Sequence, residues 1–489
     1  PFGANILFKT DACEDFVLAV EICEDVWTAM PPSVNHALAG ATIIANLSAS
    51  NEVIAKDEYR EMLVKSQSAK LYCGYIYSDA GYGESTTDLV FAGDNMIAEN
   101  GTILARSKRF NNECVYTELD LERLVGERKK SNTYNIVGSE KYVSVKLDMN
   151  IGDTKITRYV DKQPFVPSDD KKREKRSEEI LSIQSLGLKK RLDHTHAKTA
   201  VVGVSGGLDS TLALLVTVRA FDSLNLDRKN IIAVTMPCFG TTDRTYNNAV
   251  NFANSLGVTL KEVNIKAAVN QHFADIEHDP NVYDVTYENS QARERTQILM
   301  DVANKSGGLV IGTGDMSELA LGWATYNGDH MSMYGVNAGV PKTLIRYLVD
   351  YEAKRTNNDI LKKTLQDILD TPVSPELLPP KDGKISQKTE HIVGPYELHD
   401  FFLYHLMRFG SKPSKILRLA EVAFDGIYDR EVILEWLKVF YRRFFAQQFK
   451  RSCLPDGPKV GSVALSPRGD WRMPSDASYQ IWAKELETL

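Results

Sequence analysis

The stretch TAVVGVSGGLDSTLALLVTVRAF (199–221) decides the fold of this chain. Its first half, TAVVGVSGG (199–207), is an apolar run rich in β-branched residues that ends in two glycines, which predicts a buried strand followed by a tight turn. Its second half, LDSTLALLVTVRAF (208–221), predicts an apolar, buried helix. A strand that leads through a glycine turn into a helix indicates an α/β fold.

The same alternation continues towards the carboxyl terminus. Strand-like and helix-like segments follow one another at 230–237, 245–257, 259–265, 289–308 and 309–314. This order predicts a doubly wound parallel sheet with helices on both faces, in which ligands bind at the carboxyl ends of the strands. We therefore expect residues 179–489 to form one α/β domain with its functional residues in the loops after the strands.

The first part of the chain has a different pattern. Residues 1–125 alternate short β-rich runs with a helical pattern at 58–72, which predicts a layered α/β sandwich. Residues 126–178 are predicted to be a linker that contains one strand-like segment, KYVSVKLDMN (141–150). The charge run SDDKKREKRSEE (168–179) is predicted to be a solvated linker or helix surface, because its acids and bases are interleaved.

Composition excludes several classes of function. The 489 residues correspond to about two to four domains. The 58 basic and 65 acidic side chains give a net charge of −7, which offers no basis for general nucleic-acid binding. No stretch approaches the roughly 18 apolar residues that a membrane span needs. The six cysteines form no CxxC pair, which indicates reduced thiols. We expect a cytoplasmic protein with small-molecule substrates and neither a nucleic-acid nor a membrane partner.

The glycine turn SGGLDST (205–211) is a candidate phosphate site. Two glycines allow close approach of a ligand, successive N–H groups can point into one concavity, and the following helix adds its positive end. The loop has no lysine, unlike GxxxxGK[ST] loops. Asp209 would repel a phosphate unless it held a cation, so we predict that it is a Mg²⁺ ligand. The SGGxDS pattern resembles the pyrophosphate loop of the ATP pyrophosphatases, which implies cleavage of ATP between the α- and β-phosphates and an adenylated intermediate.

A second motif, GTGDMSELALGWATYNGDH (312–330), begins at a predicted strand end. There Glu318 can complete the Mg²⁺ site with Asp209. Together with YENSQARER (287–295), PKTLIRYL (341–348) and KRSCLPDGPK (450–459), this segment resembles the synthetase domain of NAD⁺ synthetases. The resemblance implies that ATP adenylates the nicotinate carboxylate of deamido-NAD⁺ and that ammonia then displaces AMP.

The resemblance also implies roles for individual residues. Two of them, Asp209 and Glu318, would hold Mg²⁺. Positions that match ATP contacts are Gly203, Val204, Ser205, Gly206, Gly207, Leu208, Asp209, Ser210, Thr313 and Lys342. Positions that match deamido-NAD⁺ contacts are Asn289, Glu318, Trp323, Ala324, Thr325, Tyr326, Asp329 and Lys450.

Cys23 is the candidate nucleophile of the first part of the chain. It follows the predicted strand FVLAVEIC (16–23), and a cysteine on a sharp turn at a strand end exposes its sulfur beside backbone N–H donors. EICEDVW (21–27) resembles the nucleophile segment of nitrilase-type carbon–nitrogen hydrolases, and NLSAS (46–50) resembles a further segment of that fold. The resemblance implies that Cys23 hydrolyses glutamine and that Ser50 and Lys56 bind it. Many relatives carry arginine where Lys56 stands.

The family's catalytic triad adds a glutamate and a lysine that lie upstream of the cysteine. Only 22 residues precede Cys23, and Lys9 and Glu14 are too near to serve. We therefore expect the chain to be cut from a longer protein, with residues 1–125 being the carboxy-terminal part of the glutaminase domain.

The whole chain thus resembles glutamine-dependent NAD⁺ synthetases, a resemblance that also implies a homo-oligomer. Four alternatives stay open. The chain could be an ammonia-only synthetase in truncated form, a GMP-synthetase-like enzyme, or a tRNA-thiolating enzyme, although the last would favour a basic face or paired cysteines. It could also be a nucleotide sensor without catalysis, which would predict loss of Asp209 or Glu318, and both are present.

Overall fold

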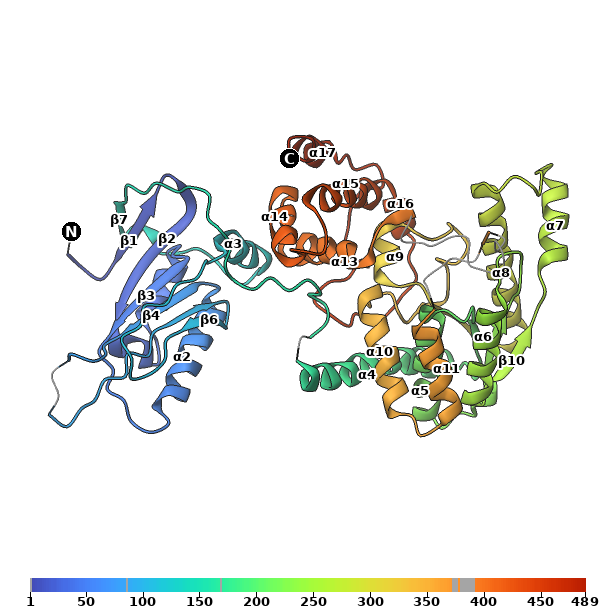
Figure 1. Cartoon of the computed structure of the whole chain (residues 1–489), viewed down its shortest axis with the longest axis horizontal. Coiled ribbons are helices and arrows are strands. Elements are labelled where there is room, and N and C mark those ends of the chain that lie inside the picture. The colour runs from blue at the N-terminus through green and yellow to red at the C-terminus, as the bar shows by residue number, and fades with distance from the viewer. Residues whose placement is uncertain (1, 85–86, 168, 372–376, 379–391) are drawn as a thin grey trace. The chain divides into compact units, whose positions relative to one another are not determined.

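The computed structural model describes residues 1–489 apart from 1, 85–86, 168, 372–376 and 379–391 (Figure 1). The chain divides into two compact units, Pro1–Val160 and Asp161–Leu489. This boundary lies inside the segment 126–178 that we predicted to be a linker. Among the described residues, no helix combines the length and the apolar character that a membrane crossing requires.

The first unit is built on a seven-stranded sheet with the order β6-β5-β4-β3-β2-β1-β7. Its strands are β1 (Ile6–Thr10), β2 (Cys13–Ile22), β3 (Ile43–Ser48), β4 (Gly74–Asp79), β5 (Met96–Glu99), β6 (Thr102–Arg106) and β7 (Val143–Lys146). Strands β2, β3 and β4 are parallel, so their carboxyl ends share one edge of the sheet. Strand β7 pairs with β1, so this part of the predicted linker contributes a strand to the first unit.

Helices complete the first unit. They are α1 (Pro32–Leu38), α2 (Lys56–Leu71) and α3 (Leu121–Lys130). The apolar residues of the central strands pack with those of α1 and α2 into one buried cluster that includes Ala19, Ile44, Val64 and Tyr75. This packing fixes the segments that follow β2 and β3, where the candidate glutaminase residues lie.

The second unit contains a five-stranded, fully parallel sheet with the order β10-β9-β8-β11-β12. Its strands are β8 (Ala200–Gly203), β9 (Ile231–Thr235), β10 (Thr259–Glu262), β11 (Leu309–Gly312) and β12 (Tyr334–Gly335). The first four confirm the predicted strands. The chain runs outward from β8 through β9 to β10 and then returns to the other side of β8, so β8 and β11 lie side by side at the position where such sheets bind ligands.

Helices cover both faces of this sheet, as predicted. Ala200 and Val202 of β8 pack against α4 (Asp170–Thr195), α5 (Leu208–Ser223) and α10 (Lys342–Arg355), whereas Val201 belongs to a second cluster with α7 (Lys266–Asp275) and α8 (Val285–Ser306). Because successive side chains of a strand point to opposite faces, this split explains the continuous apolar run of β8. The described part of the predicted charge run lies mostly exposed on α4 and just before it.

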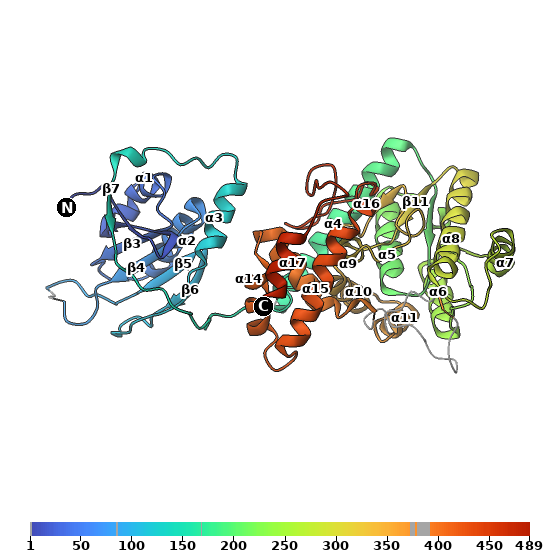
Figure 2. The ribbon, with the colours of Figure 1, turned by 90° about the horizontal axis from the view of Figure 1, so that it is seen from above.

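The other helices of this unit are α6 (Asp243–Leu256), α9 (Met316–Leu321), α11 (Asp359–Leu369), α13 (Tyr396–Tyr404), α14 (Pro413–Ala423), α15 (Arg430–Ala446), α16 (Gln448–Arg451) and α17 (Gln480–Glu487). Figure 1 shows α13, α14, α15 and α17 gathered at one side of the unit, away from α7 and β10, and Figure 2 shows α14, α15 and α17 likewise away from α7. The short helix α9 lies between this helical group and the sheet, in contact with α10, α13 and α15.

Candidate active site

The predicted phosphate loop joins β8 to α5. Gly206 has φ +85°, and a Cβ atom there would lie 2.2 Å from the carbonyl oxygen of Thr245, so the close approach of these two segments requires glycine. The N–H of Gly207 donates to Ser205 Oγ over 3.2 Å, and Ser210 Oγ donates to the carbonyl of Gly207 over 3.1 Å. The loop hydroxyls therefore hold the backbone of the loop at the amino-terminal end of α5.

The loop borders an open cavity of about 1650 Å³, a volume that includes its solvent-filled mouth. Much of the predicted ATP and substrate set lines it, namely Gly203, Val204, Ser205, Gly207, Leu208, Asp209, Ser210, Thr313, Glu318, Trp323 and Asp329. These residues follow β8 and β11 in the chain: one group lies at the end of β8 and the start of α5, and the other runs from Thr313 through α9 to Asp329. Both groups lie beyond the carboxyl ends of the two strands, where parallel sheets bind ligands.

Two motifs that are distant in sequence meet at this cavity. Asp209 lies in the first turn of α5 and Glu318 in the first turn of α9, and carboxylate oxygens of these two residues and of Asp315 all lie within 4.8 Å of one another. The ammonium of Lys342 lies 2.6 Å from Asp209, 2.8 Å from Asp315 and 3.0 Å from Glu318. We call these four residues the Lys342 cluster.

Burial governs the charges of this cluster. Burial, opposed by Lys342 and supported by repulsion from Asp209, raises the pKa of Glu318 to about 7. Burial likewise raises the pKa of Asp315 well above its usual value. Burial disfavours the ammonium of Lys342, but attraction to the three carboxylates outweighs it and raises the pKa of this lysine. Repulsion among the acids contributes to both raised pKa values, so a second cation beside them would favour their ionised forms and would itself be stabilised.

The donor set fits Mg²⁺. Asp209 Oδ1 is buried and, within the described parts of the chain, accepts no hydrogen bond. Carboxylate oxygens are the ligands that Mg²⁺ prefers, and one or two of them usually suffice because the ion keeps several waters. The predicted pair of Asp209 and Glu318 is thus brought together by the fold, with Asp315 as a third candidate ligand.

Sequence reasoning gave Asp315 no role. It is fully buried and caps α9 by accepting a hydrogen bond from the N–H of Glu318 over 2.8 Å. An aspartate three residues before a glutamate at the start of an apolar run is a recognised helix-start signal, and it could have indicated that both acids lie in one turn.

Asn337 is a second residue that the sequence did not reveal. Its Nδ2 donates to the carbonyl oxygens of Asp209 over 2.9 Å and Thr313 over 3.0 Å, so it joins the two loops of the site. Gln184 of α4 donates to Asn337 Oδ1 over 3.1 Å and fixes the direction of this amide. Nothing local in the sequence marks Asn337, because its partners lie 24 and 128 residues away.

The predicted deamido-NAD⁺ residues also come together. Thr325 Oγ1 donates to Asn289 Oδ1 over 2.7 Å, and the N–H of Thr325 donates to Asp329 Oδ1 over 2.6 Å. Lys450 Nζ donates to the carbonyl oxygen of Ala324 over 2.6 Å. These bonds shape the loop that follows α9.

Cationic side chains surround the carboxyl end of α9. Arg443 Nε donates to the carbonyl of Leu321 over 3.0 Å while its guanidinium lies 5.3 Å from the Trp323 ring centroid. Arg451 is fully buried and donates to the carbonyl of Ala320 over 2.8 Å. Unpaired carbonyls at a helix end favour cations, so these arginines, which the sequence analysis did not select, fix α9 and with it Glu318.

Cys23 in the first unit follows the end of β2 and begins a short 3-10 helix, Cys23–Trp27. Its φ of +50° is uncommon for a residue with a side chain. Lys56, at the start of α2, places its ammonium 5.4 Å from the Trp27 ring centroid and donates to the carbonyl of Asn51 over 2.8 Å. The N–H of Ser50 donates to Asp79 Oδ1 over 3.0 Å. The contact between Lys56 and Trp27 therefore places the start of α2 beside the 3-10 helix that begins at Cys23.

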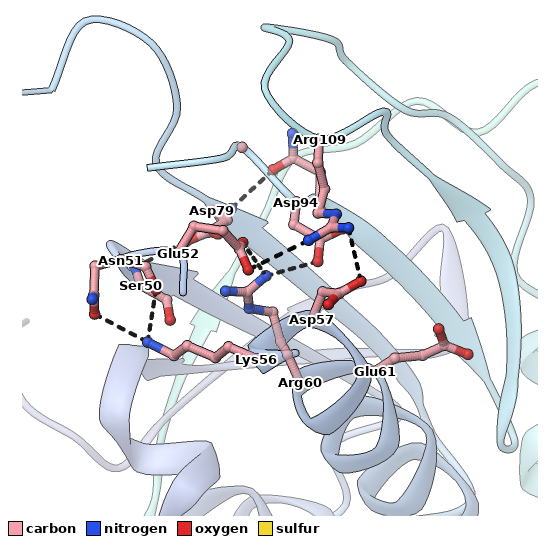
Figure 3. A network of polar contacts seen from close by, with 12 residues as sticks. Ser50, Asn51, Glu52, Lys56, Asp57, Arg60, Glu61, Asp79, Asp94 and Arg109 are labelled. Atoms are coloured by element: carbon pink, nitrogen blue, oxygen red, sulfur yellow. Dashed lines mark hydrogen bonds and ion pairs between the residues drawn. The ribbon is translucent and has the colours of Figure 1, made fainter. Parts of the chain in front are cut away.

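A buried ion network supports the Ser50–Lys56 segment (Figure 3). Arg60 of α2 is fully buried, and its Nη1 lies 3.0 Å from Glu52 Oε2 and 2.7 Å from Asp94 Oδ2. Arg109, which is more exposed, lies 3.2 Å from Asp57. The network joins the candidate glutamine-binding segment to α2 and to the segment before β5.

Comparison with known proteins identifies the family. The family model described as NAD synthase matches residues 180–427. The glutamine-dependent NAD(+) synthetase of Mycobacterium leprae is 42% identical in an alignment that covers 100% of this chain and 77% of that protein. The chain belongs to the glutamine-dependent NAD(+) synthetase family. This confirms the predicted resemblance over both units, and no finding favours the alternatives.

Other glutamine-dependent NAD(+) synthetases also align with almost the whole of this chain. The glutamine-dependent NAD(+) synthetase of Mycobacterium tuberculosis is 43% identical over 99% of this chain and 76% of its own length. The crystal structure of a glutamine-dependent NAD(+) synthetase from Cytophaga hutchinsonii has a TM-score of 0.54 and 20% identity, and it covers 99% of this chain and 74% of that structure. The latter likeness concerns the fold. In this synthetase the arrangement of elements is therefore that of the family.

The ion network of the synthetase yields a stability prediction. We expect Arg60→Met to lower the free energy of unfolding of the first unit by about 3 kcal/mol, because it removes a cation from two buried carboxylates. Arg109→Met is the matched control and should cost less than about 1 kcal/mol, since its ion pairs are partly solvated. Hydrogen exchange of α2 peptides across a urea series measures both values. Equal effects of the two substitutions would contradict this prediction.

Proposed function

We propose that the chain makes NAD⁺ by ATP-dependent amidation of deamido-NAD⁺, with ammonia released from glutamine. In the balanced reaction, ATP, deamido-NAD⁺, L-glutamine and water give AMP, diphosphate, NAD⁺ and L-glutamate. The observation that carries the proposal is the Lys342 cluster, which joins the phosphate loop to Glu318 beside the cavity in a member of this family.

The first step at the second unit is adenylation. An oxygen of the nicotinate carboxylate attacks the α-phosphorus of ATP, the bond from that phosphorus to the bridging oxygen breaks, and diphosphate leaves. The loop from Gly203 to Ser210 would bind the phosphates through its N–H groups and the positive end of α5. Thr313 and Lys342 would contribute the remaining ATP contacts, with the ammonium of Lys342 offsetting charge on the leaving diphosphate.

Mg²⁺ would be held by Asp209 and Glu318, with Asp315 as a third oxygen donor. When bound, the ion neutralises charge on the phosphate oxygens. Lys342 holds the three carboxylates close together before nucleotide binds, so the ligands of the ion would already be in place.

The second step is amidation. The nitrogen of ammonia attacks the carbonyl carbon of the adenylated nicotinate, AMP leaves with the bonding electron pair, and a proton is lost from nitrogen. Deamido-NAD⁺ would be held by Asn289, Glu318, Trp323, Ala324, Thr325, Tyr326, Asp329 and Lys450. Tyr326 supports this role because its half-exposed ring stacks on His330 and so forms part of an aromatic surface.

The first unit would supply the ammonia. The sulfur of Cys23 attacks the side-chain amide carbon of glutamine, the carbon–nitrogen bond breaks, and the nitrogen leaves as ammonia with the proton that the thiol has lost. Water then cleaves the thioester to give glutamate. Ser50 and Lys56 would bind glutamine, which is supported by the short distance between Lys56 and Trp27 in the turn of Cys23.

Product analysis tests the proposed reaction. Incubation with ATP, deamido-NAD⁺, Mg²⁺ and an ammonium salt should yield AMP, diphosphate and NAD⁺ in equal amounts. Accumulation of ADP in place of AMP would refute cleavage at the α-phosphorus. The oligomeric state stays a prediction, which light scattering of the same sample tests.

We expect Asp209→Asn to lower diphosphate release at least about a hundred-fold, because the substitution removes the charge of a metal ligand without changing side-chain size. The assay is ammonium-driven synthesis at saturating Mg²⁺. Asp222→Asn on the same helix is the matched control, since Asp222 pairs with Arg228 at the surface, and it should retain full activity. Normal release by the Asp209 variant would exclude the metal role.

We expect Cys23→Ala, made in the full-length protein that carries this chain, to abolish glutamine-driven synthesis and to leave ammonium-driven synthesis unchanged. The reason is that the nucleophile acts only on glutamine, whereas free ammonia enters the amidation step directly. Cys114→Ala is the control, because Cys114 is an exposed cysteine of the same unit. Loss of both activities in a folded Cys23 variant would contradict two separate sites.

A further inference from the structure

A side-chain amide without a role in the reaction so far binds the backbone of Cys23. Asn46 lies on β3, where it is the register partner of Glu21 on β2, and it is fully buried. Its Oδ1 accepts a hydrogen bond from the N–H of Cys23 over 3.1 Å, and its Nδ2 donates to the carbonyl oxygen of Cys23 over 3.4 Å. The amide therefore binds both backbone polar groups of the nucleophile, as a neighbouring strand binds a residue within a sheet.

The backbone of Cys23 needs such support. Strand β2 ends at Ile22, so ladder pairing no longer fixes the next residue. The φ of +50° places Cys23 in the left-handed region, where the Cβ atom of a non-glycine residue is crowded. A residue stays there only if its surroundings hold it, and such residues concentrate at active sites. The two bonds from Asn46 provide that constraint.

The direction of the Asn46 amide is itself fixed. Ser48 Oγ donates to Asn46 Oδ1 over 2.7 Å, and Asn46 Nδ2 donates to the hydroxyl oxygen of Tyr75 over 3.3 Å. With the two bonds to Cys23, both lone pairs and both hydrogens of the amide are used. A reversed amide would place its NH₂ group against the N–H of Cys23, which is unfavourable.

The last member of this series of hydrogen bonds is the buried carboxylate of Glu21. The hydroxyl of Tyr75 donates its hydrogen to Glu21, and the other oxygen of Glu21 accepts from the N–H of Ser33 over 2.8 Å. Burial and the charge of Glu21 raise the pKa of Tyr75, so its hydroxyl stays protonated. Because that hydrogen points to Glu21, the hydroxyl oxygen is left to accept from Asn46.

We propose that Asn46 is the positioning residue of the Cys23 nucleophile, and that Ser48, Tyr75 and Glu21 fix the direction of its amide. The inference rests on the proposed glutaminase role of Cys23 and adds a residue that does not touch glutamine. It sets the direction of the sulfur by holding the backbone that carries it. Because the N–H of Cys23 already donates to Asn46, this N–H is not available to the oxyanion of the tetrahedral intermediate, which a different donor must stabilise.

The decisive variant is Asn46→Asp in the full-length protein. Aspartate has the same size but lacks the NH₂ group, so one of its oxygens faces the carbonyl of Cys23 and the hydroxyl oxygen of Tyr75. Because displacement of a reacting group by about 1 Å costs about a hundred-fold in rate, we expect kcat for glutamine hydrolysis to fall about a hundred-fold. KM for glutamine and ammonium-driven synthesis should be unchanged, since neither depends on the direction of the sulfur.

Asn112→Asp is the matched control. The Asn112 amide makes the same pair of bonds to the backbone of Tyr82, accepting from its N–H over 2.9 Å and donating to its carbonyl over 3.0 Å, in an exposed part of the same unit. This variant should retain full glutamine-driven activity. Ser48→Ala removes one bond to Asn46 and keeps both bonds to Cys23, so we expect a fall in kcat of about five-fold.

Alkylation of Cys23 by iodoacetamide, followed by peptide mass spectrometry, separates positioning from general unfolding. Cys114 and Cys453 are exposed and serve as internal references. Asn46→Asp should change the alkylation rate of Cys23 and leave Cys73, a buried cysteine of the same unit, protected. Alkylation of Cys73 in this variant would indicate lost structure and contradict the proposal. If Asn46→Asp does not fold, the test of the proposal is kcat for glutamine hydrolysis in Ser48→Ala. An unchanged kcat in that variant overturns the proposal.

The outcomes distinguish this inference from the proposed function. If Cys23→Ala abolishes glutamine-driven synthesis but Asn46→Asp has normal kcat and a normal Cys23 alkylation rate, the positioning role is wrong and the glutaminase role stands. If Cys23→Ala retains glutamine-driven synthesis, the glutaminase role of Cys23 fails, and the inference that rests on it fails with it.

Discussion

The enclosure of the Lys342 ammonium by three carboxylates is the interaction on which the second unit depends. Three acids this close repel one another in a buried site, and the lysine makes their proximity tolerable. Because the acids come from the starts of α5 and α9 and the lysine from the start of α10, the cluster joins three helices at the carboxyl edge of the sheet. The predicted phosphate loop and helix α9 are therefore held together by charge as well as by backbone packing.

The strand–helix alternation of residues 199–314 in the second unit follows from local sequence rules. The apolar run before Ser205 predicts β8 because a strand buried on both faces needs no alternation, and the glycines after it predict the turn. The alternation of strands and helices predicts β8, β9, β10 and β11. Asp209 follows β8 and Glu318 follows β11, and the carboxyl ends of these two adjacent parallel strands lie at the same edge of the sheet, so the two acids come together. Strand β12 was not predicted because it has only two residues, too few for any pattern.

Two of the residues that sequence reasoning missed act through distant partners. Asn337 and Arg451 bind backbone carbonyls of other elements, and a carbonyl carries no sequence signal. The predicted strand in the segment 141–150 is present as β7, but its partner could not be predicted, because the pairing of β7 with β1 joins segments more than 130 residues apart. Such contacts depend on tertiary structure and not on local pattern.

Helix α9 has only six residues, and both of its ends are tied to other parts of the unit. Its first turn carries Glu318 in the Lys342 cluster, and its last carbonyls bind Arg443 of α15 and Arg451 of α16. Because both ends of so short a helix are tied, a displacement of α15 would be transmitted to Glu318 and the Lys342 cluster. The carboxy-terminal helices, far along the chain from the phosphate loop, are thus mechanically coupled to it.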